Sequence, residues 1–117
     1  MKYIINTIDS EYIKSVIIEG VEQKKDVKGS EIDTWEIKKT ALGEKVLVHT
    51  ASAWVNKGCI MLKANKKNGE ISAMFHYLTK CEENEKNPDD DKYMLGRFTE
   101  LMLVHFENCF DRISIKR

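Results

Sequence analysis

The chain has 117 residues, of which 42% are hydrophobic, and its 19 basic and 19 acidic side chains cancel at pH 7. This length is close to the commonest domain size and the apolar fraction is enough for one core, so we expect a single domain over residues 1–117. Without a basic excess, the composition gives no general reason to expect a nucleic-acid or membrane partner.

The cellular compartment is indicated by the cysteines and the N-terminus. Cys59, Cys81 and Cys109 show no paired spacing, which is typical of reduced thiols in a cytosolic protein. The first ten residues, MKYIINTIDS, are too short and too polar for a signal peptide. No apolar run approaches the roughly 20 residues that a membrane span needs. We therefore expect a cytoplasmic protein with no membrane segment.

The first part of the chain predicts a strand followed by a helix. Residues 2–8 alternate weakly and predict the strand. An apolar stripe at helical spacing over 10–22, behind Asp9 or Ser10 as a cap, predicts the helix. The β-branched residues 16–18 instead favour a strand. We prefer the helix and keep the strand as the alternative.

The next segment predicts a loop and two strands. Residues 23–30 are polar and indicate the loop, and residues 31–40 alternate as a strand does. Residues 42–44 predict a turn. Residues 45–55 are mostly apolar on both sides, which predicts a long strand in a central position of the sheet.

The clearest local pattern is a β-hairpin over residues 58–78. Asn68-Gly69 is the dipeptide that two-residue primed turns favour, and such a turn sets Ile60 opposite Tyr77. A four-residue loop over 66–69 is the alternative, and it keeps every side chain on the same face. The predicted core face carries Ile60, Leu62, Ala64, Ile71, Ala73, Phe75 and Tyr77, and the mixed face carries Cys59, Met61, Lys63, Ser72, Met74, His76 and Leu78.

The strongest single element is a predicted helix over residues 87–110. Asn87 suits the cap, Pro88 suits the first helical position, and the acidic residues 89–91 match the positive end of the helix dipole. One apolar stripe consists of Met94, Leu95, Phe98, Leu101, Met102 and His105, and a second consists of Tyr93, Leu103, Phe106 and Phe110. The second stripe predicts deep burial or contact with another subunit.

The order of these elements predicts the fold class. Residues 112–116 alternate as a short edge strand after the long helix. We expect an α+β fold, a mostly antiparallel sheet of about five strands with the C-terminal helix (87–110) and an N-terminal helix packed on one face.

No motif indicates a reaction. The glycines are isolated, and neither a phosphate loop nor a G-x-S-x-G turn is present, so we assign no catalytic residue and expect no cofactor. His105 and Cys109 share a helical face, but no recognisable ligand spacing exists and we assign no metal. Lysines at the hairpin tip are typical of edge protection, which makes a nucleic-acid site the less favoured interpretation.

The favoured function is that of a non-catalytic protein-interaction module that self-associates as a homodimer or binds a protein partner. The expected interface residues are Met61, Met74, Leu103, Phe106 and Phe110. The alternative is a small ligand-binding domain or enzyme with a pocket between the sheet and the C-terminal helix. In that case His76 and His105 are the residues expected in the pocket.

Overall fold

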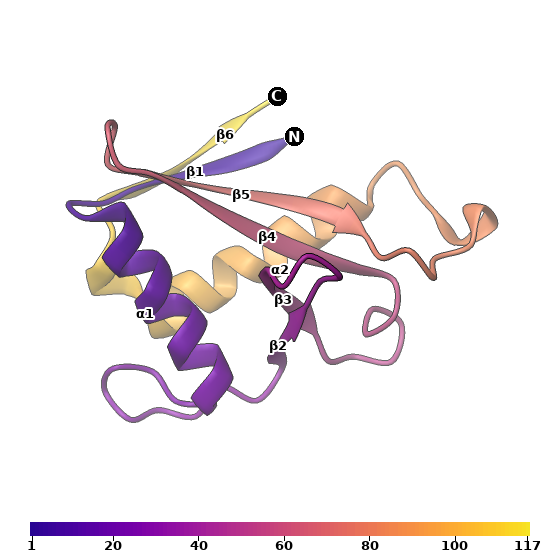
Figure 1. Cartoon of the computed structure of the whole chain (residues 1–117), viewed down its shortest axis with the longest axis horizontal. Coiled ribbons are helices and arrows are strands. Elements are labelled where there is room, and N and C mark those ends of the chain that lie inside the picture. The colour runs from indigo at the N-terminus through magenta and orange to yellow at the C-terminus, as the bar shows by residue number, and fades with distance from the viewer.

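One antiparallel sheet organises the whole chain, residues 1–117, in a computed structural model (Figure 1). Its six strands lie in the order β2-β3-β4-β5-β1-β6. They are β1 (Lys2–Asn6), β2 (Trp35–Lys39), β3 (Lys45–His49), β4 (Gly58–Asn65), β5 (Glu70–Tyr77) and β6 (Arg112–Lys116). The helices α1 (Ser10–Gln23) and α2 (Asp90–His105) pack on one face, and η1 (Glu83–Glu85) and η2 (Glu107–Cys109) are short 3-10 turns. The α+β class is confirmed, with one strand more than the five expected.

Helix α1 shows that the helical interpretation of residues 10–22 is correct. The side chain of Asp9 accepts a hydrogen bond from the Tyr12 N–H at 3.1 Å and so caps the helix. Ile17 and Val21 are completely buried on the sheet side. The burial of this stripe outweighs the modest helix propensity of the β-branched residues. Lys24 then ends the helix in the left-handed conformation, with φ 62°.

The main core lies between the two helices and one face of the sheet. It combines apolar residues of α1, of α2 and of five strands, the most deeply buried including Ile5, Ile17, Leu47, Ile60, Ile71, Met94 and Phe98. The opposite face of the sheet has a smaller cluster of Val46, Val48 and Cys59, with Val55, Met61 and Leu78 packed against it. Burial raises the pKa of the Cys59 thiol, so this cysteine stays protonated.

The start of α2 differs from the prediction. The helix begins at Asp90, with Asp89 at the cap position, and not at Asn87. The side chain of Asn87 instead accepts a hydrogen bond from the Asp89 N–H at 2.9 Å, and the Asn87 N–H donates to Asp90 at 2.9 Å. These bonds close a turn before the helix, because short polar side chains compete for backbone groups there.

The end of α2 also corrects the prediction, since the helix stops at His105 and does not reach Phe110. Phe106 turns inward to α1, where a Cβ added at Gly20 would come within 2.9 Å of its ring. Its exposed fraction is 1%. Phe106 is therefore a core residue and has no free surface for a partner, contrary to the interface prediction.

The hairpin of β4 and β5 has the four-residue loop and not the two-residue turn. Ile60 pairs with Phe75 and not with Tyr77. Gly69 takes a positive φ of 61°, a conformation that favours glycine. The predicted faces are unchanged, and Ile60 and Leu62 of the predicted core face are buried.

Strand β3 is shorter than predicted and not central. It ends at His49, after which residues 51–57 form turns that include the bond from the Trp54 N–H to the Ala51 carbonyl. It lies between the edge strand β2 and β4. The predicted edge strand 112–116 is confirmed as β6, beside β1.

Candidate functional site

A pocket of about 230 Å³ lies between α2 and the paired ends of β2 and β3. Its walls are Thr34, Trp35, His49, Arg97, Glu100, Leu101, Val104 and His105. This is the general position that the sequence indicated for a pocket, between sheet and C-terminal helix. Of the two histidines predicted there, it contains His105.

His105 is held by a carboxylate from a distant loop. Its Nδ1 lies 2.8 Å from Oδ2 of Asp26, whose side chain is 2% exposed. Oδ1 of Asp26 accepts hydrogen bonds from the backbone N–H groups of Lys28 and Ser30, each at 2.9 Å. The hydrogen bond with His105 and these backbone bonds outweigh burial and lower the pKa of Asp26. Because an ionised carboxylate only accepts, Nδ1 donates and the Nε2 of the neutral ring stays free.

His49 is the second imidazole of the pocket. Its Nδ1 accepts a hydrogen bond from the Ala51 N–H at 3.2 Å, so the proton of the neutral ring is on Nε2. The ring packs edge-on to Trp35, with 5.1 Å between centroids. Burial and the positive charge of Arg97 lower the pKa of His49. The pocket thus contains two imidazoles with different free atoms. Nε2 of His105 is a free acceptor, and Nε2–H of His49 is a free donor.

Arg97 and Glu100 complete the polar wall. Nη1 of Arg97 lies 2.7 Å from Oε1 of Glu100, and its Nε donates to the Tyr93 hydroxyl at 3.2 Å. Tyr93 stacks on Trp54 with centroids 5.0 Å apart. These contacts fix the guanidinium beside the pocket.

His76 lies elsewhere. It is exposed on β5, opposite Cys59 and on the sheet face away from the helices, so it does not share a pocket with His105. The sequence did not indicate Asp26 as a partner of His105. Asp26 and His105 are 79 positions apart, and no local pattern joins them.

The predicted interface residues fall on two different surfaces. Met61 and Met74 pair across β4 and β5 on the face away from the helices, where Met74 is 37% exposed. Leu103 is 52% exposed on α2. Phe110 is half-buried against the main core.

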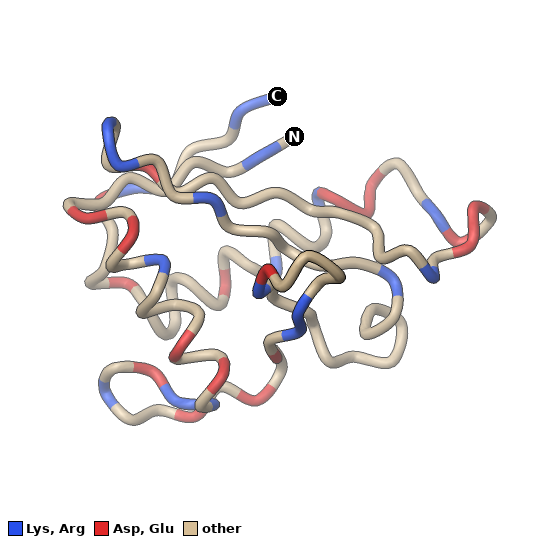
Figure 2. Tube along the Cα trace, viewed as in Figure 1, with Lys and Arg blue, Asp and Glu red and all other residues tan.

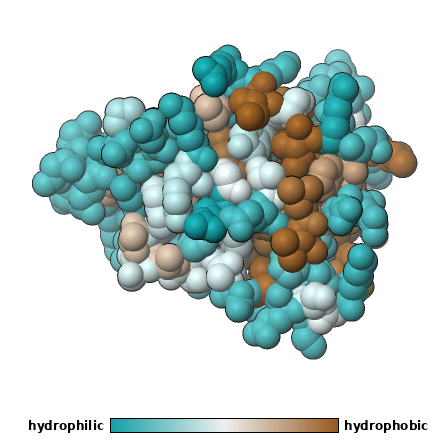
Figure 3. Space-filling view, turned by 180° about the vertical axis from the view of Figure 1, so that it is seen from behind, coloured by the Kyte–Doolittle hydropathy of each residue, from teal (hydrophilic) through white to brown (hydrophobic).

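A band of exposed apolar side chains covers the α2 side of the molecule. Figure 3 shows it crossing the C-terminal part of α2 and reaching β6. The large apolar residues exposed on these two elements are Leu103, Val104 (71%) and Ile115 (57%), besides Tyr93 near the start of α2. We call Leu103, Val104 and Ile115 the apolar band.

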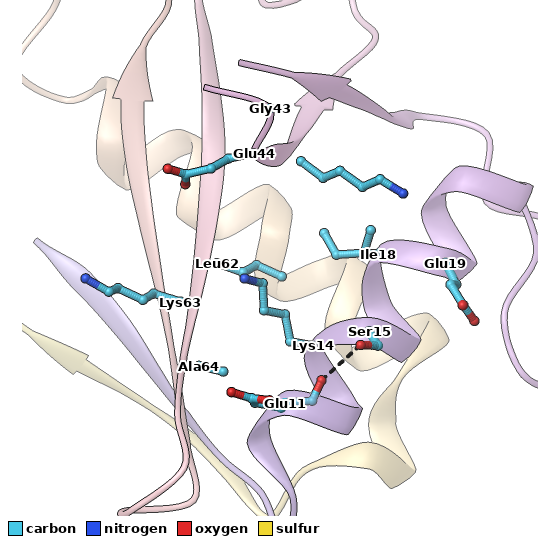
Figure 4. A pocket seen from close by; sticks show the side chains of 11 residues that line it. Glu11, Lys14, Ser15, Ile18, Glu19, Gly43, Glu44, Leu62, Lys63 and Ala64 are labelled. Atoms are coloured by element: carbon cyan, nitrogen blue, oxygen red, sulfur yellow. Dashed lines mark hydrogen bonds between the residues drawn. The ribbon is translucent and has the colours of Figure 1, made fainter. Parts of the chain in front are cut away.

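An open groove of about 620 Å³ lies beside α1 (Figure 4). Its lining comes from α1, from the turn between β2 and β3 with the first residue of β3, and from β4. These residues are Glu11, Lys14, Ser15, Ile18, Glu19, Gly43, Glu44, Lys45, Leu62, Lys63 and Ala64.

Charged residues of both signs occur along the whole chain, and two segments are enriched in one sign. Figure 2 shows basic residues at the tip of the β4–β5 hairpin and acidic residues around the segment before α2.

The structure has no group of three or more His, Cys, Asp or Glu side chains that could hold a metal ion. None of its helices combines the length and apolarity that crossing a membrane requires. Comparison of the chain with protein-family models, with curated proteins and with solved structures finds no match.

Proposed function

We propose that the chain is a protein-interaction module that associates with a second copy of itself through the apolar band. The observation that supports this is the exposure of three large apolar side chains on neighbouring elements, at 52%, 71% and 57% for Leu103, Val104 and Ile115. Clustered apolar surface of this kind marks interaction sites more often than scattered single residues do.

The charges beside the apolar band favour a second copy as its occupant. β6 carries the exposed basic residues Arg112 and Lys116, whereas the exposed acidic residue Glu107 lies just beyond the end of α2. In a two-fold arrangement, β6 of one copy faces the end of α2 of the other, and the reverse contact forms at the same time. Opposite charges then meet on both sides of the buried apolar residues.

The test is the oligomeric state in solution. Light scattering and sedimentation at high micromolar concentration should give a dimer for the wild-type chain and a monomer for Leu103→Asp, which would bury a charge in the interface. Leu42→Asp is the matched control, because Leu42 is 87% exposed in the turn between β2 and β3 and should leave the dimer intact. A strictly monomeric wild-type chain at these concentrations contradicts the proposal.

A second candidate function is the binding of a small anion in the pocket of His49, Arg97 and His105. The observation that favours it is the meeting of one imidazole donor, Nε2–H of His49, with the guanidinium of Arg97 in one open cavity. Nε2–H of His49 and Arg97 are donors for a carboxylate or phosphate, and Leu101 and Val104 provide an apolar wall.

Phosphate titration tests this second function. NMR of the His49 ring should show a pKa below the usual value of about 6.5, because burial and Arg97 disfavour its protonation. Bound phosphate should raise that pKa, and Arg97→Gln should weaken the effect. His76→Gln, on the other face of the sheet, should not change it. An unchanged His49 titration in phosphate argues against an anion site.

A further inference from the structure

β2 forms one edge of the six-stranded sheet, and β6 forms the opposite edge (Figure 1). β2 pairs with β3 over Trp35–Lys39 and has no strand on its other side. An edge strand leaves a row of backbone donors and acceptors without strand partners, and these groups can pair with another chain. The charge pattern of β2 indicates which chain fits this edge.

The hydrogen bonds between β2 and β3 show which backbone groups point outward. The Thr40 N–H donates to the Glu44 carbonyl at 2.8 Å, in register with the β2–β3 ladder. Bonded pairs alternate along an antiparallel ladder, so the residues of even number in β2 bond to β3. The N–H and carbonyl groups of Trp35, Ile37 and Lys39 therefore point away from the sheet.

Most of these outward groups are free. The N–H groups of Ile37 and Lys39 make no hydrogen bond within the chain. The Trp35 carbonyl accepts a hydrogen bond from the Lys24 amine, which leaves that oxygen one further lone pair. Lys39 is exposed and Ile37 is half-buried. Another strand can therefore form bonds along this edge.

The charges of β2 lie on the sheet face away from the helices. Glu36 and Lys38 pair across the ladder with Val48 and Val46, which belong to the apolar cluster of that face. Nζ of Lys38 lies 3.9 Å from Oε1 of Glu36, with side chains 41% and 37% exposed. An ion pair this long and this exposed is weak, so both charges are available to a partner strand.

A second copy of β2 fits this edge in one two-fold register. Because outward groups must face outward groups, a symmetric antiparallel pair of three or more β2 residues is centred on Glu36, Ile37 or Lys38. A centre at Glu36 or at Lys38 sets two like charges directly opposite each other, which is unfavourable. A centre at Ile37 pairs all five residues of the strand and sets Glu36 of each copy opposite Lys38 of the other.

The remaining pairs of this register are compatible with it. Ile37 pairs with Ile37 of the other copy on the helix-facing side, and their backbone groups bond to each other. Lys39 lies opposite Trp35, where the Lys24 amine is already bound, so this outer pair contributes less. Lysine on an edge strand usually prevents pairing. Here Glu36 makes the edge compatible with a strand of complementary pattern, and β2 itself has that pattern.

We propose that the β2 edge binds the β2 edge of a second copy, with the strands antiparallel and Ile37 at the two-fold centre. The contact is at the opposite edge of the sheet from β6 and does not depend on the apolar band. A pair of five-residue strands is a small contact, so we expect it to form at about millimolar concentration. Where the apolar band associates as well, β2 pairing connects dimers into larger assemblies.

Charge exchange in the full chain tests the register. Every variant also carries Leu103→Asp, which removes the apolar band contact, and sedimentation at about 1 mM measures association. The Leu103→Asp parent should self-associate. Glu36→Lys alone and Lys38→Glu alone each set like charges opposite each other, so each should self-associate at least ten-fold more weakly. An equimolar mixture of these two variants should associate again, because two basic residues of one strand then meet two acidic residues of the other.

Amide hydrogen exchange provides the second readout. Raising the concentration of the parent to about 1 mM should protect the N–H groups of Ile37 and Lys39 but not change that of Lys38, which already bonds to β3. Lys67→Glu, at the exposed tip of the β4–β5 hairpin, is the matched charge control and should associate like the parent.

Two results would overturn the proposal. One is a mixture of the two charge variants that associates no better than each variant alone. The other is exchange at Ile37 and Lys39 that does not depend on concentration. A wild-type chain that is monomeric at high micromolar concentration, but associates near 1 mM with this charge dependence, would contradict the apolar band and support β2 pairing.

Discussion

Asp26 connects two parts of the chain that share no helix or strand. Its carboxylate accepts from His105, which follows it by 79 positions, and from the backbone of its own loop. These contacts hold the loop after α1 against the end of α2. The residue therefore acts in the stability of the fold as well as in the shape of the pocket.

The lowered pKa of Asp26 predicts a pH-dependent stability. A carboxyl group with a lower pKa in the folded state stabilises the fold above its unfolded value of about 3.9, and this contribution is lost as the pH falls through the folded pKa. Asp26→Asn keeps an oxygen for the loop bonds but has no charge. Its melting temperature should be lower than that of the wild type at pH 7, and the two should converge below about pH 4. A difference that does not change with pH would contradict this assignment.

The start of α2 is fixed by contacts with the end of β5. Oδ2 of Asp90 accepts from the Tyr77 hydroxyl at 2.6 Å and from the Asn87 N–H at 2.9 Å, and Lys57 lies 3.3 Å away. Burial alone would raise the pKa of Asp90, but these partners lower it overall. Burial and the bond to Asp90 raise the pKa of the Tyr77 hydroxyl.

Tyr77→Phe should therefore destabilise the protein by about 1–2 kcal/mol, because it leaves a buried carboxylate with one donor fewer. Urea unfolding measures this cost. Tyr93→Phe is the control, since the Tyr93 hydroxyl bonds to Arg97 at the exposed surface and its loss should cost much less. Equal costs for the two variants would show that the Asp90 contacts do not stabilise α2.

The elements differ in how well local patterns predict them. The hairpin faces follow from period-two alternation, which is the same for the two-residue and the four-residue loop, and α1 follows from its stripe and cap. The bounds of α2 were wrong because Asn87 and Asp90 use their side chains in a preceding turn, and because Phe106 leaves the helical path to pack on Gly20. The bonds of Asn87 and Asp90 are local alternatives to a helical cap, whereas the contact of Phe106 with Gly20 is tertiary, and no local sequence window contains both of its partners.

At the scale of the whole molecule, the candidate sites arise from relations between distant elements. The groove depends on β3 separating from β4 after one paired residue, and the pocket depends on a loop, two strands and a helix that meet. Local periodicity predicts which residues form strands but not how neighbouring strands diverge. For this reason the sequence predicts Asp26 only as part of a polar loop, without its partner His105.

The position of β1 has a consequence for how the chain folds. This strand, the first in the chain, lies between β5 and β6, so Ile5 pairs with Ile71 on one side and with Ile113 on the other. During synthesis, one edge of β1 stays uncovered until β6, the last strand of the chain, has been made. Contacts between residues so far apart slow folding relative to a helical bundle of similar size. A nascent chain that lacks residues 112–116 would expose one edge of β1, and that edge is the point at which aggregation competes with completion of the sheet.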